Sequence, residues 1–331
     1  MTTAKTFSPE VLRVDPERET ERICTRILAL MRNELKRGGM VVALSGGIDS
    51  SVTAALSVRA LGKKRVIGLE MPERHSSAET LALSGKVAAC LGIETVVEDI
   101  SGILQSVGFY EKYDSAVRMV LPQYGEGWSS KIVISALADK PRFTSFRLVA
   151  RDPEGAQSVV RLPLQPYLQI VAATNFKQRI RKMLEYYHAD RLNFAVAGTP
   201  NRLEYDQGFF VKLGDGAADL KPIAHLYKSQ VYQLAEFLGI PEEVRRRAPT
   251  TDTYSLAQGQ DEFYFSLPYR EMDLCLYAKN HGIPAEHAAS VLGLTPQEVR
   301  MVFEDIDAKR RTTRYLHLPP LLVEEVGKGG A

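Results

Sequence analysis

Short apolar runs alternate with helical segments over the first hundred residues, and this alternation limits the fold more than any other feature of the chain. Each apolar run is short enough to be a buried strand, and each helical segment ends at a glycine. Strands that alternate with helices form a parallel sheet covered on both faces. We therefore predict a doubly wound α/β fold, with strands at Met40–Leu44, Arg65–Met71 and Glu94–Ile100 and helices at Asp49–Leu61 and Ser77–Leu91.

The pattern weakens between Gly108 and Pro166 and then returns. This stretch has scattered turn residues and short alternating runs, and Arg151–Gly155 has the composition of a hairpin turn between two of them. It predicts a lobe with some β structure, at 108–166, inserted into one domain that spans 1–331. Around it we expect helices at Glu19–Lys36, Asn175–Asp190 and Tyr227–Leu238, a fourth core strand at Asn193–Ala197, and a mostly helical C-terminal part from Pro268 onward.

Composition and charge argue against several classes of protein. The chain has 331 residues, 45% hydrophobic and 25% charged, and its net charge of +2 gives no global reason to bind nucleic acid or an anionic membrane. No apolar run is long enough to span a bilayer, and the N-terminus lacks the apolar core of a secretory signal. Cys24, Cys90 and Cys275 form no CxxC pair, so neither a zinc site nor a disulfide framework is indicated. We expect a cytoplasmic protein.

A strand–turn–helix unit at Ala43–Ser51 carries the chemistry. Its turn contains Gly46 and Gly47, which let the backbone approach an anion without Cβ atoms in the way. The helix that follows would point free N–H groups and the positive end of its dipole at the same place. Hydroxyl donors come from Ser45, Ser50 and Ser51, and the whole unit predicts a phosphate site.

Asp49 lies in the first turn of that helix, where its carboxylate would repel a phosphate. A bridging Mg²⁺ reverses the sign of that interaction, so we expect this cation at the site. Two other phosphate motifs do not fit. No lysine follows Gly47, as GxxxxGK[ST] requires, and the dinucleotide fingerprint GxGxxG is absent.

The string Ser45-Gly46-Gly47-Ile48-Asp49-Ser50 resembles the SGGxDS pyrophosphate loop of the N-type ATP pyrophosphatases, in the adenine nucleotide alpha hydrolase-like superfamily. That superfamily includes NAD synthetases, GMP synthetases, asparagine synthetases and several tRNA-modifying enzymes. The resemblance implies a Rossmann-like sheet of the ATP pyrophosphatase type. It also implies attack on the α-phosphate of ATP, which gives an adenylated substrate and pyrophosphate. The loop selects the superfamily but not the member.

Motifs in the second half of the chain resemble those of the NAD synthetase family. Gly198–Glu204 resembles the GTxNxxE element of the family, Gly208–Asp219 its GxFxKxGDGxxD element, and Leu226–Val231 its LYKxQV element. Pro249–Asp252 and Gln260–Glu262 are similar to the PTAD and QxDE segments that follow. The family also has an NxKxRxR helix, which is matched by Asn175, Lys177, Arg179 and Arg181. In order and spacing the likeness covers Glu19–Val107 and Ala172–Arg311.

The resemblance implies a carbon–nitrogen ligase that amidates nicotinate adenine dinucleotide (deamido-NAD) with ammonia and ATP. The products would be NAD, AMP and pyrophosphate, formed through an adenylated carboxylate. Some relatives carry a fused amidase domain with a catalytic cysteine, and we expect no such glutaminase domain here. Free ammonia is then the expected nitrogen source, unless a separate protein delivers it. Family members are homodimers, so we expect a homodimer.

Site residues are carried over only where this sequence matches the family's motifs. The resemblance implies ATP contacts at Ala43, Leu44, Ser45, Gly46, Gly47, Ile48, Asp49, Ser50, Thr199, Lys228 and Thr250. It implies Mg²⁺ ligands at Asp49 and Glu204, and deamido-NAD contacts at Arg179, Lys212, Asp219 and Lys309. Ala308 stands where many members have histidine, so only Lys309 of that pair is carried over.

Other interpretations stay open beside this one. A related adenylating enzyme could act on another carboxylate or on tRNA, although scattered cysteines and near-neutral charge disfavour a tRNA enzyme. The basic helix with Arg179 could be an ordinary solvated face. Ala285–Arg300, with Gly293 between two helical stretches, is somewhat like a DNA-binding helix-turn-helix, but a helical hairpin packed on the core is favoured.

Overall fold

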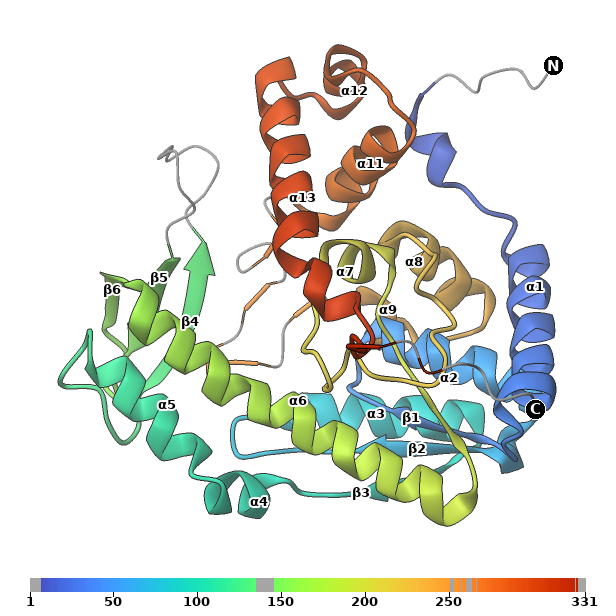
Figure 1. Cartoon of the computed structure of the whole chain (residues 1–331), viewed down its shortest axis with the longest axis horizontal. Coiled ribbons are helices and arrows are strands. Elements are labelled where there is room, and N and C mark those ends of the chain that lie inside the picture. The colour runs from blue at the N-terminus through green and yellow to red at the C-terminus, as the bar shows by residue number, and fades with distance from the viewer. Residues whose placement is uncertain are drawn as a thin grey trace.

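The computed structural model describes residues 7–134, 146–250, 253–256, 258–259, 264–265, 267–324 and 326. Its central sheet has four parallel strands in the order β3-β2-β1-β7, and a second, antiparallel sheet has the order β4-β5-β6 (Figure 1). The central strands are β1 (Met40–Ala43), β2 (Val66–Glu70), β3 (Glu94–Val97) and β7 (Ala195–Ala197). A parallel sheet with helices on both faces confirms the predicted fold class.

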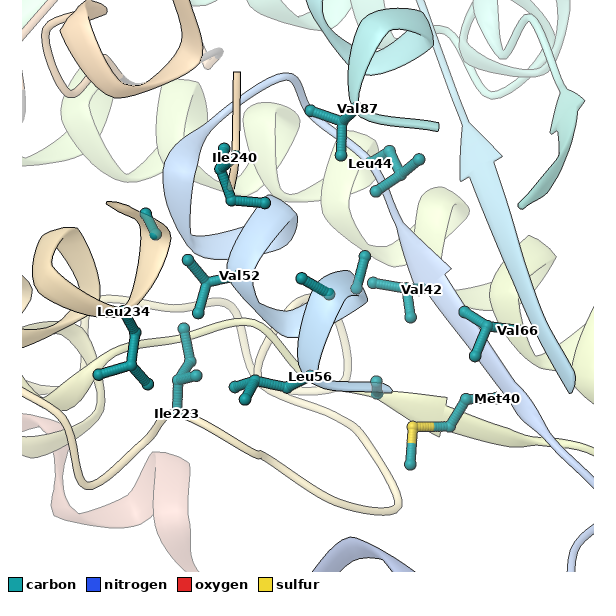
Figure 2. Close-up of a cluster of buried hydrophobic side chains, with 14 of the residues drawn as sticks. Met40, Val42, Leu44, Val52, Leu56, Val66, Val87, Ile223, Leu234 and Ile240 are labelled. Atoms are coloured by element: carbon teal, nitrogen blue, oxygen red, sulfur yellow. The ribbon is translucent and has the colours of Figure 1, made fainter. Parts of the chain in front are cut away.

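Side chains of β1 alternate between two separate hydrophobic cores. Met40 and Val42 pack with α2 (Ile48–Leu61), α3 (Ala78–Leu91) and α8 (Lys228–Phe237), and Figure 2 shows them beside Val52 and Leu56 of α2. Val41 points to the other face, towards α6 (Leu164–Leu192). Residues one position apart in a strand face opposite sides of a sheet, so a fully apolar strand buries both.

Helix α6 is longer than the sequence predicted. We expected a helix from Asn175, but α6 begins at Leu164 and follows Pro163, with Pro166 in its first turn. Proline is tolerated in the first turn, where its missing N–H would have no helical partner. Pro163 and Pro166, which lie in the stretch predicted as the inserted lobe, therefore mark the beginning of the helix.

The stretch 108–166, called the inserted lobe below, contains the predicted β structure. It has α5 (Phe109–Arg118), β4 (Ser129–Ile134), β5 (Phe146–Arg151) and β6 (Gln157–Arg161). The expected hairpin turn joins β5 to β6, where the Asp152 N–H donates to the Ala156 carbonyl over 3.0 Å. Residues 135–145 of the lobe lie outside the described part of the chain.

The C-terminal helices form a third core. Helices α11 (Tyr269–Asn280), α12 (Ala285–Leu292) and α13 (Pro296–His317) bury Met272, Ala288 and Val302 together. The segment considered as a helix-turn-helix is therefore a hairpin packed on α11 (Figure 1). The remaining elements are η1 (Pro9–Leu12), α1 (Pro16–Ala29), η2 (Leu30–Leu35), η3 (Lys63–Arg65), α4 (Ser101–Ser106), α7 (Arg202–Gln207) and α9 (Glu242–Arg246). Within the described residues, no helix combines the length and apolar character needed to cross a membrane.

Candidate active site

The turn between β1 and α2 wraps around an open helix N-terminus. Gly46 has φ +66°, and a Cβ there would lie 2.7 Å from the Thr80 carbonyl oxygen, so only glycine fits. Gly47 precedes α2, and no described side chain caps that end of the helix. The Ser50 and Ser51 hydroxyls donate to the Gly47 carbonyl over 3.0 and 2.8 Å, which fixes the turn. The first N–H groups of α2 stay available to an anion.

This turn opens into a pocket of about 1170 Å³. One face of α6 lines the pocket from Tyr167 to Glu185, a rise of about 27 Å at 1.5 Å per residue. Other walls come from the β1–α2 turn, α7, α13 and the inserted lobe.

Two of the predicted charged residues meet directly where the β1–α2 turn lines the pocket. The Lys228 amine, from the first position of α8, pairs with the Asp49 carboxylate. Lys228 is buried, which opposes its charge, but Asp49 and Glu204 outweigh that effect and raise its pKa. Lys228 is therefore a fixed positive charge beside the open end of α2.

The second carboxylate, Glu204, is tied to the same cluster through Asn201. The Asn201 side-chain amide donates to Asp49 over 3.2 Å. Asn201 also caps α7 in a reciprocal capping box with Glu204, with contacts of 3.3 and 3.1 Å. Asp49 and Glu204 both line the pocket. Among the described residues, no three acidic, histidine or cysteine side chains gather into a metal cage, so any cation here would also need ligand oxygens.

Asp273 supports Lys228 and was not found by sequence reasoning. Its carboxylate accepts hydrogen bonds from the backbone N–H groups of Lys228 (3.1 Å) and Ser229 (2.6 Å), so it caps α8 from α11. Asp273 is fully buried, and burial raises its pKa to about 7 despite those donors. A carboxylate inside the otherwise apolar run Met272–Leu276 was the signal that could have found it.

Thr199 and Thr250 also line the pocket. Arg247, which the sequence analysis did not select, lines it as well and donates to the Thr80 hydroxyl over 3.0 Å. Thr251 and Asp252, and the whole of Gln260–Glu262, lie outside the described residues.

Three of the four predicted dinucleotide residues line the pocket, namely Arg179, Lys212 and Lys309. Arg179 is exposed, and its Nε donates to the Lys212 carbonyl over 3.3 Å. The Lys212 amine donates to the carbonyls of Tyr315 and Leu318 at the end of α13, over 2.8 and 3.2 Å. The Lys309 amine lies 2.6 Å from Asp305, and burial lowers the pKa of Lys309 although Asp305 opposes this shift.

Asp219 lies elsewhere. Among the described lining residues neither Asp219 nor Gly46 occurs. The Asp219 carboxylate instead accepts from the Val196 backbone N–H over 2.7 Å and from the Tyr186 hydroxyl over 3.3 Å, so it holds the edge strand β7.

The basic helix is not a uniformly solvated face. Lys177 and Lys182 are both buried, and Lys182 pairs with Glu185 over 2.6 Å at the pocket wall. Asp215 lines the pocket beside Lys182 and Glu185. Burial raises the pKa of both Glu185 and Asp215.

Comparison with known proteins gives one consistent family. A sequence model of the family described as NAD synthase matches residues 20–120 and 154–314. The NH(3)-dependent NAD(+) synthetase of Mesorhizobium japonicum is 57% identical over 96% of this chain and 100% of its own length. That of Thermotoga maritima is 33% identical over 82% of this chain and 90% of its own length.

Solved structures show the same fold at lower identity. The NH3-dependent NAD synthetase from Campylobacter jejuni matches with a TM-score of 0.61 and 23% identity, covering 94% of this chain and 100% of its own. An NMN synthetase from Francisella tularensis matches with a TM-score of 0.60 and 20% identity, covering 94% of this chain and 99% of its own. The fold is thus shared by enzymes whose names differ in the product they form.

Proposed function

Because the chain belongs to the NAD synthase family, we propose that its pocket amidates the nicotinate carboxylate of deamido-NAD with ammonia. The enzyme is a ligase of ammonia-dependent NAD synthesis. Its relatives of that name match this chain over nearly their whole length. One observation carries the site: the open N-terminus of α2, the Asp49–Lys228 pair and Glu204 share a single pocket. These groups suit the phosphates of ATP.

The reaction that we propose has two steps. A carboxylate oxygen of deamido-NAD attacks the α-phosphorus of ATP, and pyrophosphate leaves. Ammonia then attacks the acyl carbon, and AMP leaves with that carboxylate oxygen. No side-chain nucleophile is needed, so catalysis rests on positioning and on charge stabilisation. Lys228 and the N–H groups of α2 would stabilise the pyrophosphate as it departs, a role supported by their place at the same pocket.

The donor set fits a magnesium ion. Asp49 and Glu204 supply carboxylate oxygens beside a phosphate cradle, and Mg²⁺ prefers carboxylate and phosphate oxygens. When bound, Mg²⁺ would neutralise phosphate charge. Asn201 contacts both carboxylates, since its side-chain amide donates to Asp49 and its backbone N–H donates to Glu204.

The dinucleotide takes the rest of the pocket. Arg179, Lys212 and Lys309 offer positive charge to its pyrophosphate and carboxylate, as the family resemblance implies. Asp219 enters the proposal only as a polar residue that supports β7. Its contacts with Val196 and Tyr186 favour that supporting role over direct contact with the substrate.

Free ammonia is the proposed nitrogen donor, and the printed names of the relatives support it. Ammonia delivered by a separate protein would react in the same pocket. We further propose a cytoplasmic homodimer. Three free thiols, Cys24, Cys90 and Cys275, suit a reducing compartment. Helix α6 exposes large apolar side chains that a second copy could cover, namely Leu164, Leu168, Met183 and Tyr187.

The test is direct. The protein is incubated with ATP, Mg²⁺, ammonium and deamido-NAD, and the nucleotide products are separated by chromatography. We expect NAD, AMP and pyrophosphate in equal amounts. Nicotinate mononucleotide in place of deamido-NAD is the control for acceptor choice. Faster amidation of that mononucleotide would overturn the proposed substrate.

A further inference from the structure

Strand β4 is at the edge of the lobe's sheet, and a distant segment covers its free side. That segment, called the docked segment below, consists of Thr253–Leu256 and Gln258. The Ser130 N–H donates to the Ser255 hydroxyl over 2.9 Å, and the Leu256 N–H donates to the Ser130 carbonyl over 3.2 Å. The Gln258 side-chain amide donates to the Ile132 carbonyl. Ser130 and Ile132 are two positions apart, so both present backbone groups to the same edge.

On the lobe's side of this contact, Ser130 belongs to a buried hydrogen-bond network. The Ser130 hydroxyl is fully buried and lies 2.9 Å from the Tyr113 hydroxyl and 3.0 Å from the Tyr124 hydroxyl. From the docked segment, Tyr254 is buried in the same hydrophobic cluster as Ile132 of β4. Buried polar groups that are fully hydrogen-bonded specify one arrangement.

A buried ion pair holds the beginning of the docked segment. The Lys177 amine, on α6, donates to the Thr253 carbonyl over 2.9 Å and to the Glu73 carboxylate over 2.8 Å. Both charged side chains are almost completely buried, and Lys177 keeps the pKa of Glu73 low against the effect of burial. Three elements that line the pocket are thereby joined, since Pro72, Thr253 and residues of α6 all contribute to its wall.

Thr250 lies just before the docked segment and bridges to Gly259 just after it. This bridge ties Thr250, a pocket residue, to the described residues of the docked segment. Contacts within the protein hold the docked segment, so ATP need not supply the free energy for ordering it on binding. The inserted lobe, which lines the pocket at Ile134 and Phe146, thus also contacts a second pocket wall through the edge of β4.

We propose that the edge of β4, together with Lys177, sets the position of the docked segment and of Thr250 for ATP, with Ser130 and Ser255 as positioning residues. This rests on the proposed function only in naming ATP as the ligand at Thr250. Ser255 acts through the backbone of β4 and not on the reacting atoms.

Ser255→Ala tests the contact with β4 without disturbing the lobe core, because Ser255 is only half-buried and lies outside that core. Ser158→Ala, on β6 at the opposite edge of the same sheet, is the matched control. Ser255→Thr keeps the hydroxyl and should restore the contact. Two measurements are made on each: hydrogen exchange of the docked segment without ligand, and ATP affinity by titration calorimetry with Mg²⁺.

For Ser255→Ala we expect faster exchange at the Ser130 amide, which loses its acceptor, and in the docked segment, with the rest of the protein unchanged. We also expect a rise in the Kd for ATP of roughly three- to tenfold, as for one lost neutral hydrogen bond. Ser158→Ala and Ser255→Thr should match the wild type in both measurements. Unchanged exchange, or faster exchange with an unchanged Kd, would overturn the proposal. A wild type that binds ATP but forms no NAD overturns only the proposed function, whereas one that binds no ATP overturns both.

Discussion

The amine of Lys228 pairs with the carboxylate of Asp49, although the two residues are 179 positions apart in the sequence. Each comes from the beginning of a helix, α8 and α2, so the pair joins two helix N-termini at one point of the pocket. Helix N-termini and a lysine amine both attract anions, and the carboxylate beside them attracts a cation. The pair therefore suits the phosphate–magnesium complex that we propose for this pocket.

Replacing Lys228 by Gln should lower kcat/KM for ATP by about 100-fold or more, the effect of removing a group that stabilises developing charge. Asp49 keeps its Asn201 contact in the variant, so the fold should survive. Steady-state kinetics with ATP as the varied substrate measure the effect. Lys86→Gln, which breaks the exposed Lys86–Glu243 pair, is the matched control and should behave as wild type. A Lys228 variant as active as that control would remove Lys228 from the mechanism.

Asp49→Asn and Glu204→Gln should each lose most turnover, because both remove charge from the proposed magnesium site. The loss should be several kcal/mol of transition-state stabilisation. Glutamine can still accept in the α7 capping box, so Glu204→Gln isolates the charge from the structural role. Turnover measured against Mg²⁺ concentration checks the assignment. Near-normal turnover at ordinary Mg²⁺ in either variant would show that the altered residue is not a ligand.

Arg179→Lys should raise the KM for deamido-NAD far more than the KM for ATP. Lysine keeps the charge but loses the planar fork that gives two parallel hydrogen bonds to an anion. The cost should be about 1.5–3 kcal/mol, or roughly ten- to hundredfold in kcat/KM. Varying each substrate in turn separates the two constants. Equal shifts in both KM values, or no shift in either, would mean that Arg179 belongs to an ordinary solvated face of α6.

Asp273 should make the protein less stable as pH rises towards neutrality. Its pKa is about 7 in the folded protein and near 4 when unfolded. Between those values the folded state binds the extra proton, so the free energy of unfolding falls as pH rises and levels off above the folded pKa. Over pH 5.5 to 8 the loss from this group should be on the order of 1–2 kcal/mol. Urea unfolding of wild type and Asp273→Asn at both pH values measures it, and the same pH dependence in both proteins would contradict the assignment.

Local patterns accounted for much of the fold and for the glycine turn before α2. Alternating runs predicted the parallel strands, and Gly46 and Gly47 predicted the anion site, because each signal lies within a few residues. For Asp273, the local pattern offered only a carboxylate in an apolar run and gave no sign of its partner. It caps a helix 44 residues away in sequence, and contacts made only by tertiary packing leave no periodic trace.

The docking of Ser255 on Ser130 is hidden for the same reason, since 125 residues separate them. Asp219 illustrates the opposite case. It matches a family motif by position, but the contacts of its carboxylate are with β7 and Tyr186 rather than within the pocket. A motif match identifies a residue, while its role depends on the surrounding packing.

The central claim is that the pocket activates the nicotinate carboxylate by joining it to the α-phosphate of ATP. The most direct test uses deamido-NAD labelled with ¹⁸O in both carboxylate oxygens, with unlabelled ATP, Mg²⁺ and ammonium, and mass spectrometry of the products. We expect one labelled oxygen in AMP, one in the amide of NAD, and none in pyrophosphate. Label in inorganic phosphate, with ADP as the other product, would contradict the account.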